Sequence, residues 1–301
     1  MSIVEIAQDG RHISLFRGFL KISEGDQEVA RIPLDSIHAL LLNCYQATLT
    51  QNILLTCADE GIPVILCGTN HQPAGILWPV VSHYKQAGNL QAQLNSSQPL
   101  AKQLWKQLVQ AKITAQHQVL EEVGRSTGDA LQEMAGRVKS GDTDNLEAQA
   151  ARRYWPLLMG DNFTRDTKAG GCNSLLNYGY AILRSTVARA VISVGLHPSL
   201  GVHHQNRLNA FCLVDDLMEP YRPVIDYCVF RLLNDGHNEV TRETKQRLAG
   251  IVEWLLPMPS GNTTISHAAL LTAQSLVQSF EANNANLICP ISAVPKLSNT
   301  A

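Results

Sequence analysis

The hydrophobic pattern of the chain changes near Pro99, and this change limits the possible folds more than any other feature. Before it, apolar residues alternate or form short β-branched segments separated by glycines, as in strands. After it, apolar residues recur every three to four positions over long stretches, which is the period of an amphipathic helix. The pattern predicts an α+β protein in which a small N-terminal β-rich domain precedes a larger all-helical domain.

The same pattern predicts where the elements and domains lie. Strands are expected at 2–6, 12–16, 19–23, 28–33 and 63–67, whereas the apolar run 35–42 fits either element type. Helices are expected at 51–60, 99–123, 128–138, 145–158, 173–194, 211–233, 240–256 and 265–280. The predicted organisation is a β-rich domain at 1–80, a linker at 81–97, a helical domain at 98–282 and a flexible tail at 283–301.

Composition excludes several classes of protein. The chain has 301 residues and a net charge of −2, and residues 1–80 are its most acidic part. Charge alone therefore does not indicate a nucleic-acid partner. Seven cysteines without a Cys-x-x-Cys pair argue against a disulfide framework and a zinc ribbon. The N-terminal sequence lacks the features of a signal peptide, and no window resembles a membrane span, so we expect a cytoplasmic protein without a membrane partner.

An acidic residue opens one of the predicted helices. With Asp144 as N-cap and Glu147 three positions later, the two acids form the pattern of a capping box, which explains them structurally. Arg152 and Arg153 follow on the same helix. They fit either a solvated helix face or a set of phosphate ligands, and the sequence leaves both readings open.

A second polar cluster lies within the apolar segment 201–223. Asp216 and Glu219 are three positions apart, so on a continuous helix they project from one face. A buried carboxylate needs a partner, which is either a nearby arginine or a divalent cation. Arg207 and Arg222 are the candidate arginines. His203 and His204 are adjacent, so at most one of them should face the acids.

Two carboxylates and one imidazole, from Glu147, Glu219 and His204, suit Mg²⁺ or Mn²⁺. The three residues are far apart in sequence, so spacing by itself does not prove a metal site. The chain shows no phosphate-binding loop around Gly170, and no Gly-x-Ser-x-Gly elbow or cysteine–histidine pair that would supply a nucleophile. These other constellations are weaker than the acidic clusters.

Three long blocks carry a family resemblance: NLEAQAARRYW, FTRDTKAGGCNSLLNYGYAILRS and HHQNRLNAFCLVDDLMEPYRP. In order and spacing they resemble the CRISPR-associated integrase of the adaptation module, the Cas1 family, in its type II form. The sequence departs from the commoner family pattern at Ala210 and Val214, neither of which is a proposed ligand. The family also combines an N-terminal β domain with a C-terminal helical domain.

The resemblance implies a homodimeric, metal-dependent DNA integrase whose helical domain is catalytic. Such an enzyme joins the 3′-hydroxyl ends of short foreign DNA into the CRISPR repeat array by phosphodiester transesterification. Glu147, His204 and Glu219 match the family's metal ligands for Mg²⁺ or Mn²⁺, and Asp216 matches a further active-site acid. The implied partners are double-stranded DNA (the prespacer and the repeat array), a second copy of the chain and a small Cas2 dimer.

We expect Arg152, Arg153, Arg165 and Lys168 to contact DNA phosphates, which position DNA without reading its sequence. Arg184, Arg189 and the basic residues of 242–247 are the next candidates. The acidic β domain is expected to form the dimer interface rather than to bind DNA. Two other functions remain open: a metal-dependent nuclease or branched-DNA resolvase using water as nucleophile, and a non-catalytic scaffold that holds DNA ends.

Overall fold

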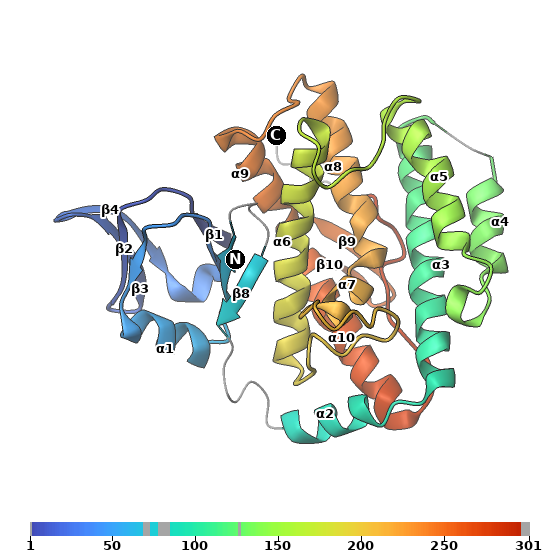
Figure 1. Ribbon diagram of the computed structural model, residues 1–301, viewed down its shortest axis with the longest axis horizontal. Helices are drawn as coiled ribbons and strands as arrows, with labels where there is room; N and C mark the ends of the chain where they lie inside the picture. Colours follow the sequence, from blue (N-terminus) through green and yellow to red (C-terminus); the bar gives the residue numbers. More distant parts are fainter. Residues whose placement is uncertain (1, 69–72, 78–84, 126–127, 296–301) are drawn as a thin grey trace. The chain divides into compact units, whose positions relative to one another are not determined.

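The computed structural model describes residues 2–68, 73–77, 85–125 and 128–295 (Figure 1). Contacts between Cα atoms divide the chain into two compact units, Met1–Tyr84 and Lys85–Ala301. The first unit holds most of the strands and the second holds most of the helices. The predicted α+β class is therefore confirmed.

The N-terminal unit contains two four-stranded sheets and one helix. One sheet has the strand order β1–β5–β7–β8 and the other β4–β3–β2–β6. The strands are β1 Ser2–Ile6, β2 Arg11–Phe16, β3 Phe19–Glu24, β4 Gln27–Pro33, β5 Ile37–Leu42, β6 Thr48–Leu49, β7 Val64–Cys67 and β8 Pro73–Leu77. The helix α1 is Gln51–Asp59. The apolar run 35–42, which fits either element type by its sequence, contains strand β5. This strand pairs in parallel with β1 and with β7.

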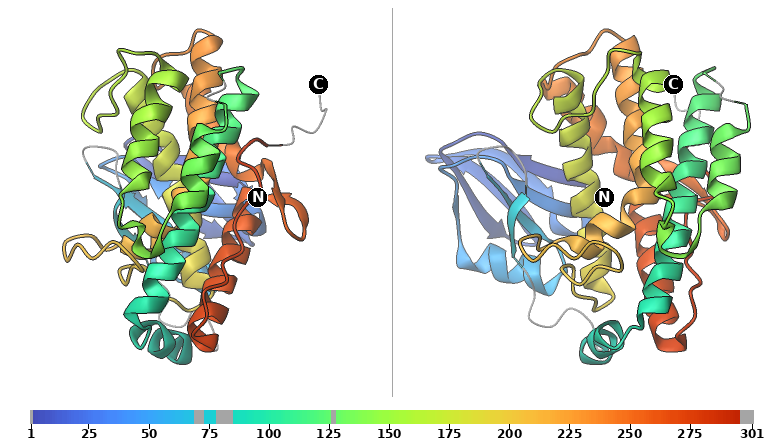
Figure 2. Two further views of the ribbon diagram at one scale, coloured as in Figure 1. Left: turned by 90° about the vertical axis from the view of Figure 1, so that its right-hand side faces the viewer. Right: turned by 45° about the vertical axis from the view of Figure 1, so that its right-hand side comes forward.

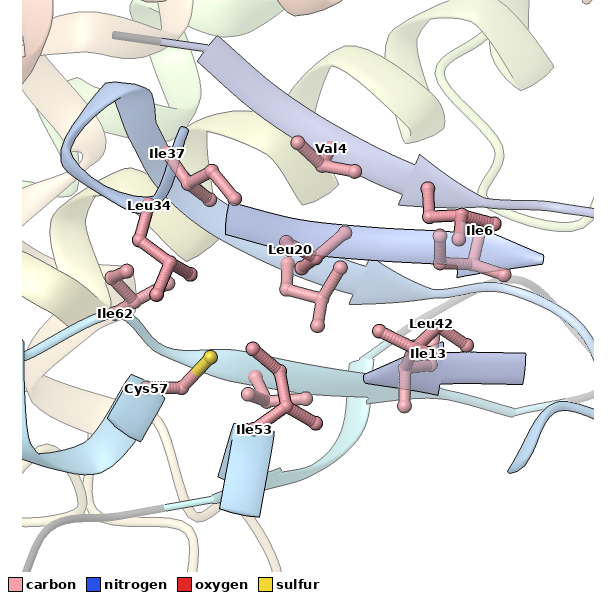
Figure 3. Close-up of a cluster of buried hydrophobic side chains, with 13 residues drawn as sticks. Val4, Ile6, Ile13, Leu20, Leu34, Ile37, Leu42, Ile53, Cys57 and Ile62 are labelled. Carbon is pink, nitrogen blue, oxygen red and sulfur yellow. The ribbon is translucent and has the colours of Figure 1, made fainter. Parts of the chain in front are cut away.

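The apolar faces of both sheets and of α1 share one core. Val4 of β1, Ile13 of β2 and Leu20 of β3 are buried there beside Ile53 and Cys57 of α1 (Figure 3). Val4 and Ile6 on β1, like Leu20 and Ile22 on β3, are two positions apart and both buried in this core, because every second side chain of a strand points to the same face. The short apolar segments that the sequence predicts as strands are therefore the segments that supply this core.

The helical unit is built around three long helices that pack against shorter ones. Its helices are α2 Gln86–Leu94, α3 Gln98–Glu122, α4 Ala130–Arg137, α5 Leu146–Met159, α6 Cys172–Ser193, α7 Cys212–Leu217, α8 Arg222–Asn234, α9 Arg242–Gly250 and α10 Ile265–Ala282. Helix α3 contacts α4, α5 and α8, and α6 contacts α8, α9 and α10. Figures 1 and 2 show α3 and α5 side by side from several directions.

The helix predicted over 211–233 is broken in the structure. Helix α7 ends at Leu217, a 3-10 turn covers Glu219–Tyr221, and α8 begins at Arg222. Pro220 lies in the turn and Pro223 in the first turn of α8, and a proline inside a helix removes a hydrogen bond. The break changes the direction in which the acidic residues on either side of it project.

Three further expectations differ from the structure. The helical unit is not entirely helical, because β9 Leu255–Met258 and β10 Gly261–Thr264 form an antiparallel hairpin where the predicted helix 240–256 should end. The expected linker contains α2, whose buried Gln93 donates to the carbonyls of His197 and Leu200. The expected flexible tail is hydrogen-bonded as far as Val294, for example between Ile288 and Ser275.

Within the described residues, none of the helices is both long and apolar enough to cross a membrane.

Candidate active site

Helix α3 carries two side chains that organise the polar centre of the helical unit. Trp105 and Lys112 are seven residues apart, so they lie on the same side of the helix about two turns from each other. Trp105 is 1% exposed, and the Lys112 side chain is 12% exposed. A nearly buried lysine requires negative partners, since an unpaired buried ammonium is costly.

Those partners are the two glutamates predicted as metal ligands. The Nζ atom of Lys112 lies 2.5 Å from Oε1 of Glu147 on α5 and 2.5 Å from Oε2 of Glu219 in the turn before α8. The other oxygen of Glu219 accepts a hydrogen bond of 2.8 Å from Nε of Arg222. The structure therefore brings Glu147 and Glu219, which are 72 positions apart in the sequence, to one cation.

Burial and charge oppose each other in this cluster. Burial by itself raises the pKa of Glu219, but Arg222 and Lys112 outweigh it and hold that pKa below its usual value. Burial lowers the pKa of Lys112, but Glu219 and Glu147 outweigh it, so the pKa is raised. The same carboxylate raises the pKa of Arg222 against the effect of burial. Glu219 and both cations are thus charged at neutral pH.

His204 and Asp216 form the second half of the centre. Nδ1 of His204 lies 2.5 Å from Oδ1 of Asp216, whose side chain is fully buried. This hydrogen bond, followed by the negative charge of Asp216, raises the pKa of His204 despite its partial burial. The Asp216 carboxylate also accepts from the backbone N–H groups of Val202, His203 and His204. Asp216 therefore fixes both the ring of His204 and the loop that carries it.

This loop depends on a glycine. A Cβ atom on Gly201 would lie 2.4 Å from the carbonyl oxygen of His204 and 2.7 Å from Oδ2 of Asp216. Only a residue without a side chain lets the backbone wrap so closely around the carboxylate.

The neighbouring histidine has a different environment. The ring of His203 stacks on Trp105 with centroids 4.0 Å apart and an angle of 3° between the planes. Burial lowers the pKa of His203, so this ring is neutral at pH 7. As the sequence predicts, one histidine of the pair faces the acids, and the other packs on α3.

The N-terminus of α5 is capped differently from the prediction. The capping residue is Asn145, in a left-handed conformation, and it makes no side-chain cap. Instead, the carboxylate of Asp142 accepts from the N–H groups of Leu146 and Glu147 at 2.8 and 3.0 Å. Asp144 pairs with Lys139 outside the helix. The capping-box interpretation is therefore wrong, and Glu147 is left available for Lys112.

The basic residues predicted to contact DNA lie in unlike environments. Arg152 and Arg153 are exposed on α5, and Lys168 is exposed in the loop after it. Arg165 instead donates to Oδ1 of Asn173 at 3.0 Å and to Oδ1 of Asn177 at 2.7 Å. Those asparagines also bind loop carbonyls, so Arg165 joins this loop to α6.

The alternative basic candidate Arg184 is also engaged. Its guanidinium binds both carboxylate oxygens of Asp215, at 2.8 and 2.7 Å, and packs over the ring of Phe211. Asp215 therefore faces α6, away from Asp216.

The side chains present fit a divalent cation in part. Glu147 and Glu219 converge on a position that holds a positive charge, the ammonium of Lys112. A cation replacing the ammonium would find two carboxylates of the preferred hard-oxygen type. Within the described part of the chain, however, no three acidic, histidine or cysteine side chains already form a metal-binding group. The third ligand would be His204, whose charge influences Glu219.

A cavity of about 450 Å³ adjoins His204. Its polar wall comes from the loop after Gly201 and from the ends of α2 and α3, through His204, Gln205, Asn206, Arg207, Gln93 and Gln98. The His204 side chain, which is 44% exposed, belongs to a residue that lines this cavity.

Sequence reasoning missed Lys112, Trp105 and Asp142. A signal for Lys112 was present, because Leu104 and Leu108 define an apolar stripe on α3 whose next position, four residues later, is this lysine. A charged residue that continues an apolar stripe indicates a buried ionic partner. Trp105 and Asp142 carried no comparable signal.

Comparisons with known proteins identify the family of the chain. The family model for "CRISPR associated protein Cas1" matches residues 4–251. The CRISPR-associated endonuclease Cas1 of Neisseria meningitidis is 35% identical over 281 residues, which are 92% of this chain and 90% of that protein.

Solved structures show the same fold. A casposase bound to its integration product superposes with a TM-score of 0.81 at 18% identity, covering 95% of this chain and 92% of that one. A chain of a Cas6-RT-Cas1–Cas2 complex superposes with a TM-score of 0.75 at 20% identity, covering 99% of this chain and 36% of the larger one. With the family model matched over most of its length, the chain belongs to the Cas1 family of CRISPR-associated proteins.

Proposed function

We propose that the protein is a metal-dependent DNA integrase of CRISPR adaptation, which joins the 3′-hydroxyl ends of short foreign DNA into the repeat array. The observation that carries this proposal is the convergence of Glu147 and Glu219 on one buried cationic position, beside the His204–Asp216 pair. A structural neighbour of the same fold is a casposase bound to an integration product. The chain offers the acidic centre that phosphodiester chemistry needs.

A divalent cation, Mg²⁺ or Mn²⁺, would be held by Glu147, Glu219 and His204, and it would offset the charge on the phosphoryl oxygens. The protein's own residues prepare this position. Arg222 fixes one oxygen of Glu219, and Asp216 occupies Nδ1 of His204, which leaves Nε2 for a ligand. In joining, the 3′-oxygen of the incoming strand bonds to phosphorus as the target strand's own 3′-oxygen leaves, so one phosphodiester replaces another.

A second candidate function is hydrolysis. The Neisseria relative is named an endonuclease, and the same acidic centre serves when water replaces the 3′-hydroxyl as nucleophile. The two activities differ in product, since one joins strands and the other only cleaves them.

The proposed DNA surface is the exposed basic pair Arg152 and Arg153 on α5, with Lys168 in the loop that follows. Glu147 lies on the same helix, about one and a half turns before the pair. Arg165 is a weaker candidate, because both of its terminal nitrogens are occupied by asparagines. Phosphate contacts from this surface would make affinity fall steeply with salt.

The proposed assembly is a homodimer that works with a Cas2 dimer. A structural neighbour is a Cas6-RT-Cas1–Cas2 complex, and a further one is a Cas1–DNA complex. The interface proposed for the homodimer is the N-terminal unit, whose sheets have exposed edge strands.

The decisive experiment incubates the protein, alone and with a Cas2 partner, with a labelled short duplex and a supercoiled plasmid in Mn²⁺ or Mg²⁺. Transfer of label to the plasmid supports the integrase, cleavage without transfer supports the nuclease, and binding alone supports the scaffold. Glu147→Ala should abolish joining and weaken Mn²⁺ binding in calorimetry, whereas Lys112 keeps Glu219 as its partner and the protein still folds. The matched control is Glu133→Ala, an exposed glutamate on α4. Normal joining by the Glu147 variant would contradict the assigned site.

A further inference from the structure

A tight turn beside the active site presents an apolar side chain to solvent. The backbone N–H of Asn209 donates to the carbonyl of Asn206 at 3.0 Å, and the N–H of Leu208 donates to the Asn206 side chain at 2.9 Å. Arg207 and Leu208 occupy the tip of this turn. Leu208 is 95% exposed, more than any other large apolar side chain in the described residues, among which Tyr45 follows at 64%.

The exposure of Leu208 is built into a fixed backbone. Oδ1 of Asn209 accepts from the N–H of Phe211 and from Arg184 on α6, both at 3.0 Å, and its amide donates to Asp215 at 2.7 Å. The turn is therefore anchored to α6 and α7. Its tip cannot fold inward to bury the leucine without breaking these bonds.

The turn also lies close to His204. It begins two residues after His204, and Arg207, Asn206 and His204 line the same cavity of about 450 Å³. Arg207, the neighbour of Leu208 in the turn, therefore shares this cavity with His204. A single exposed leucine is common on protein surfaces. Leu208 differs from such a residue, because it is held at the tip of an anchored turn, next to Arg207 and close to His204.

We propose that the 206–209 turn is a DNA wedge, a role that rests on the proposed function. Leu208 packs against the bases beside the phosphate at the active site and partly unstacks them, while Arg207 pairs with the neighbouring phosphate. Apolar side chains inserted between base steps act in this way in other DNA-binding proteins. The ligand is duplex DNA, and unstacking opens the backbone around the phosphate that must enter the site.

The test uses the full-length protein and two target duplexes, one fully paired and one with two mismatched base pairs at the joining position. Leu208→Ser should slow joining on the paired target about tenfold, equivalent to about 1.4 kcal/mol, and should leave joining on the mismatched target unchanged. Leu208→Phe should keep the wild-type rate on both targets. Ile291→Ser, at a 55% exposed isoleucine of the helical unit, is the control for a surface substitution.

A second readout does not depend on joining. A 2-aminopurine placed at the joining position of the paired target should brighten when the wild-type protein binds, because the base loses its neighbours. The brightening should be lost with Leu208→Ser and kept with Ile291→Ser.

The outcomes separate the wedge from the proposed function. Unchanged joining and unchanged 2-aminopurine signal in Leu208→Ser would overturn the wedge while the integrase stands. Equal loss on paired and mismatched targets, or a change of molecular mass in light scattering, would also overturn it and would make Leu208 a general or protein-binding contact. If the wild-type protein joins neither target, the integrase fails, and the fluorescence signal still decides whether the turn unstacks bases.

Discussion

At the residue scale, the centre of the site is a lysine rather than a metal ligand. Lys112 joins carboxylates from two separate elements, and neither carboxylate is near it in sequence. The ammonium occupies the position where the two carboxylates would otherwise repel each other. Lys112 and a divalent cation are therefore expected to compete for the same place.

This competition predicts the behaviour of Lys112→Met. Removing one partner of a buried ionic cluster leaves an uncompensated charge and costs about 3–5 kcal/mol. We expect the variant to be less stable than wild type without metal and to gain more stability from Mn²⁺, because the cation no longer has to displace the lysine. Thermal unfolding with and without Mn²⁺ measures both effects. Lys102→Met, at an exposed position of the same helix, is the control. If Mn²⁺ increases the stability of Lys112→Met and of Lys102→Met by the same amount, Lys112 and the cation do not compete for one position.

A second residue-scale prediction concerns Asp226, which is buried on α8 and accepts a hydrogen bond from Tyr180. Burial raises the pKa of Asp226 to about 7, and the bond from Tyr180 limits the rise. The folded state thus holds a proton that the unfolded chain releases near pH 4, so stability falls as pH increases between about 4 and 7.

The difference between the two pKa values corresponds to about 4 kcal/mol. Asp226→Asn keeps the hydrogen-bond acceptor but has no charge to bury. Relative to wild type, the variant should therefore become more stable as the pH increases from 4 to 7, as measured by urea unfolding at several pH values. Parallel pH profiles of the two proteins would show that Asp226 does not titrate in this range.

At the element scale, the packing of α6 on α8 depends on Gly179. A Cβ atom there would lie 2.5 Å from Cγ2 of Ile225 and 3.3 Å from Cδ2 of Leu248. Gly179→Ala should therefore push the helices apart and cost about 1–3 kcal/mol, as overpacked cores do. The control is Gly88→Ala on α2, where a Cβ meets nothing within 4 Å.

Gly88→Ala should stabilise the protein by about 0.5–1 kcal/mol, because alanine loses less backbone freedom than glycine when a helix forms. Chemical denaturation of the two variants gives opposite signs if the α6–α8 contact is as close as described. If Gly179→Ala and Gly88→Ala destabilise the protein by similar amounts, the loss at Gly179 does not come from a steric clash.

The break between α7 and α8 is an element-scale feature with a chemical consequence. On the continuous helix expected from the sequence, Asp216 and Glu219 would share a face. With the break before Pro220, Asp216 binds the loop of His204, and Glu219 turns towards α3. Two acids that look like one cluster in the sequence therefore serve two different parts of the site.

At the scale of the whole molecule, the edge strands of the N-terminal unit suggest how the chain assembles. Strand β4 is an edge of its sheet, and Val29 on it is 50% exposed. An exposed edge with an apolar residue invites pairing with another chain. We therefore expect a homodimer at micromolar concentration, formed through the N-terminal unit.

Val29→Lys should shift this dimer towards monomer in light scattering, because a lysine on an edge strand opposes pairing. Ile291→Lys, at a residue of the helical unit that is 55% exposed, should leave the dimer intact. A wild-type monomer, or a dimer that responds to the Ile291 change alone, would contradict this assignment.

The sequence by itself determined the elements with a regular hydrophobic period. Strands β1 to β4 and helices α3, α5, α6 and α10 lie within a few residues of their predicted bounds, because local periodicity and glycine breaks fix them. The family resemblance pointed to Glu147, His204, Glu219 and Asp216, because motif order is a property of the chain alone. The break between α7 and α8 at Pro220 and the β9–β10 hairpin were not predicted, because the hydrophobic period does not indicate where a helix is interrupted.

The tertiary structure decided which charges meet. Nothing local distinguishes Lys112 from a solvated lysine, since its partners come from α5 and from the turn before α8. Likewise, Asp142 rather than Asp144 caps α5, at the end of a segment in which Gly141, Asp142 and Asn145 have positive φ. Electrostatic partners are set by distances of a few ångströms between distant segments, and those distances arise when the helices pack.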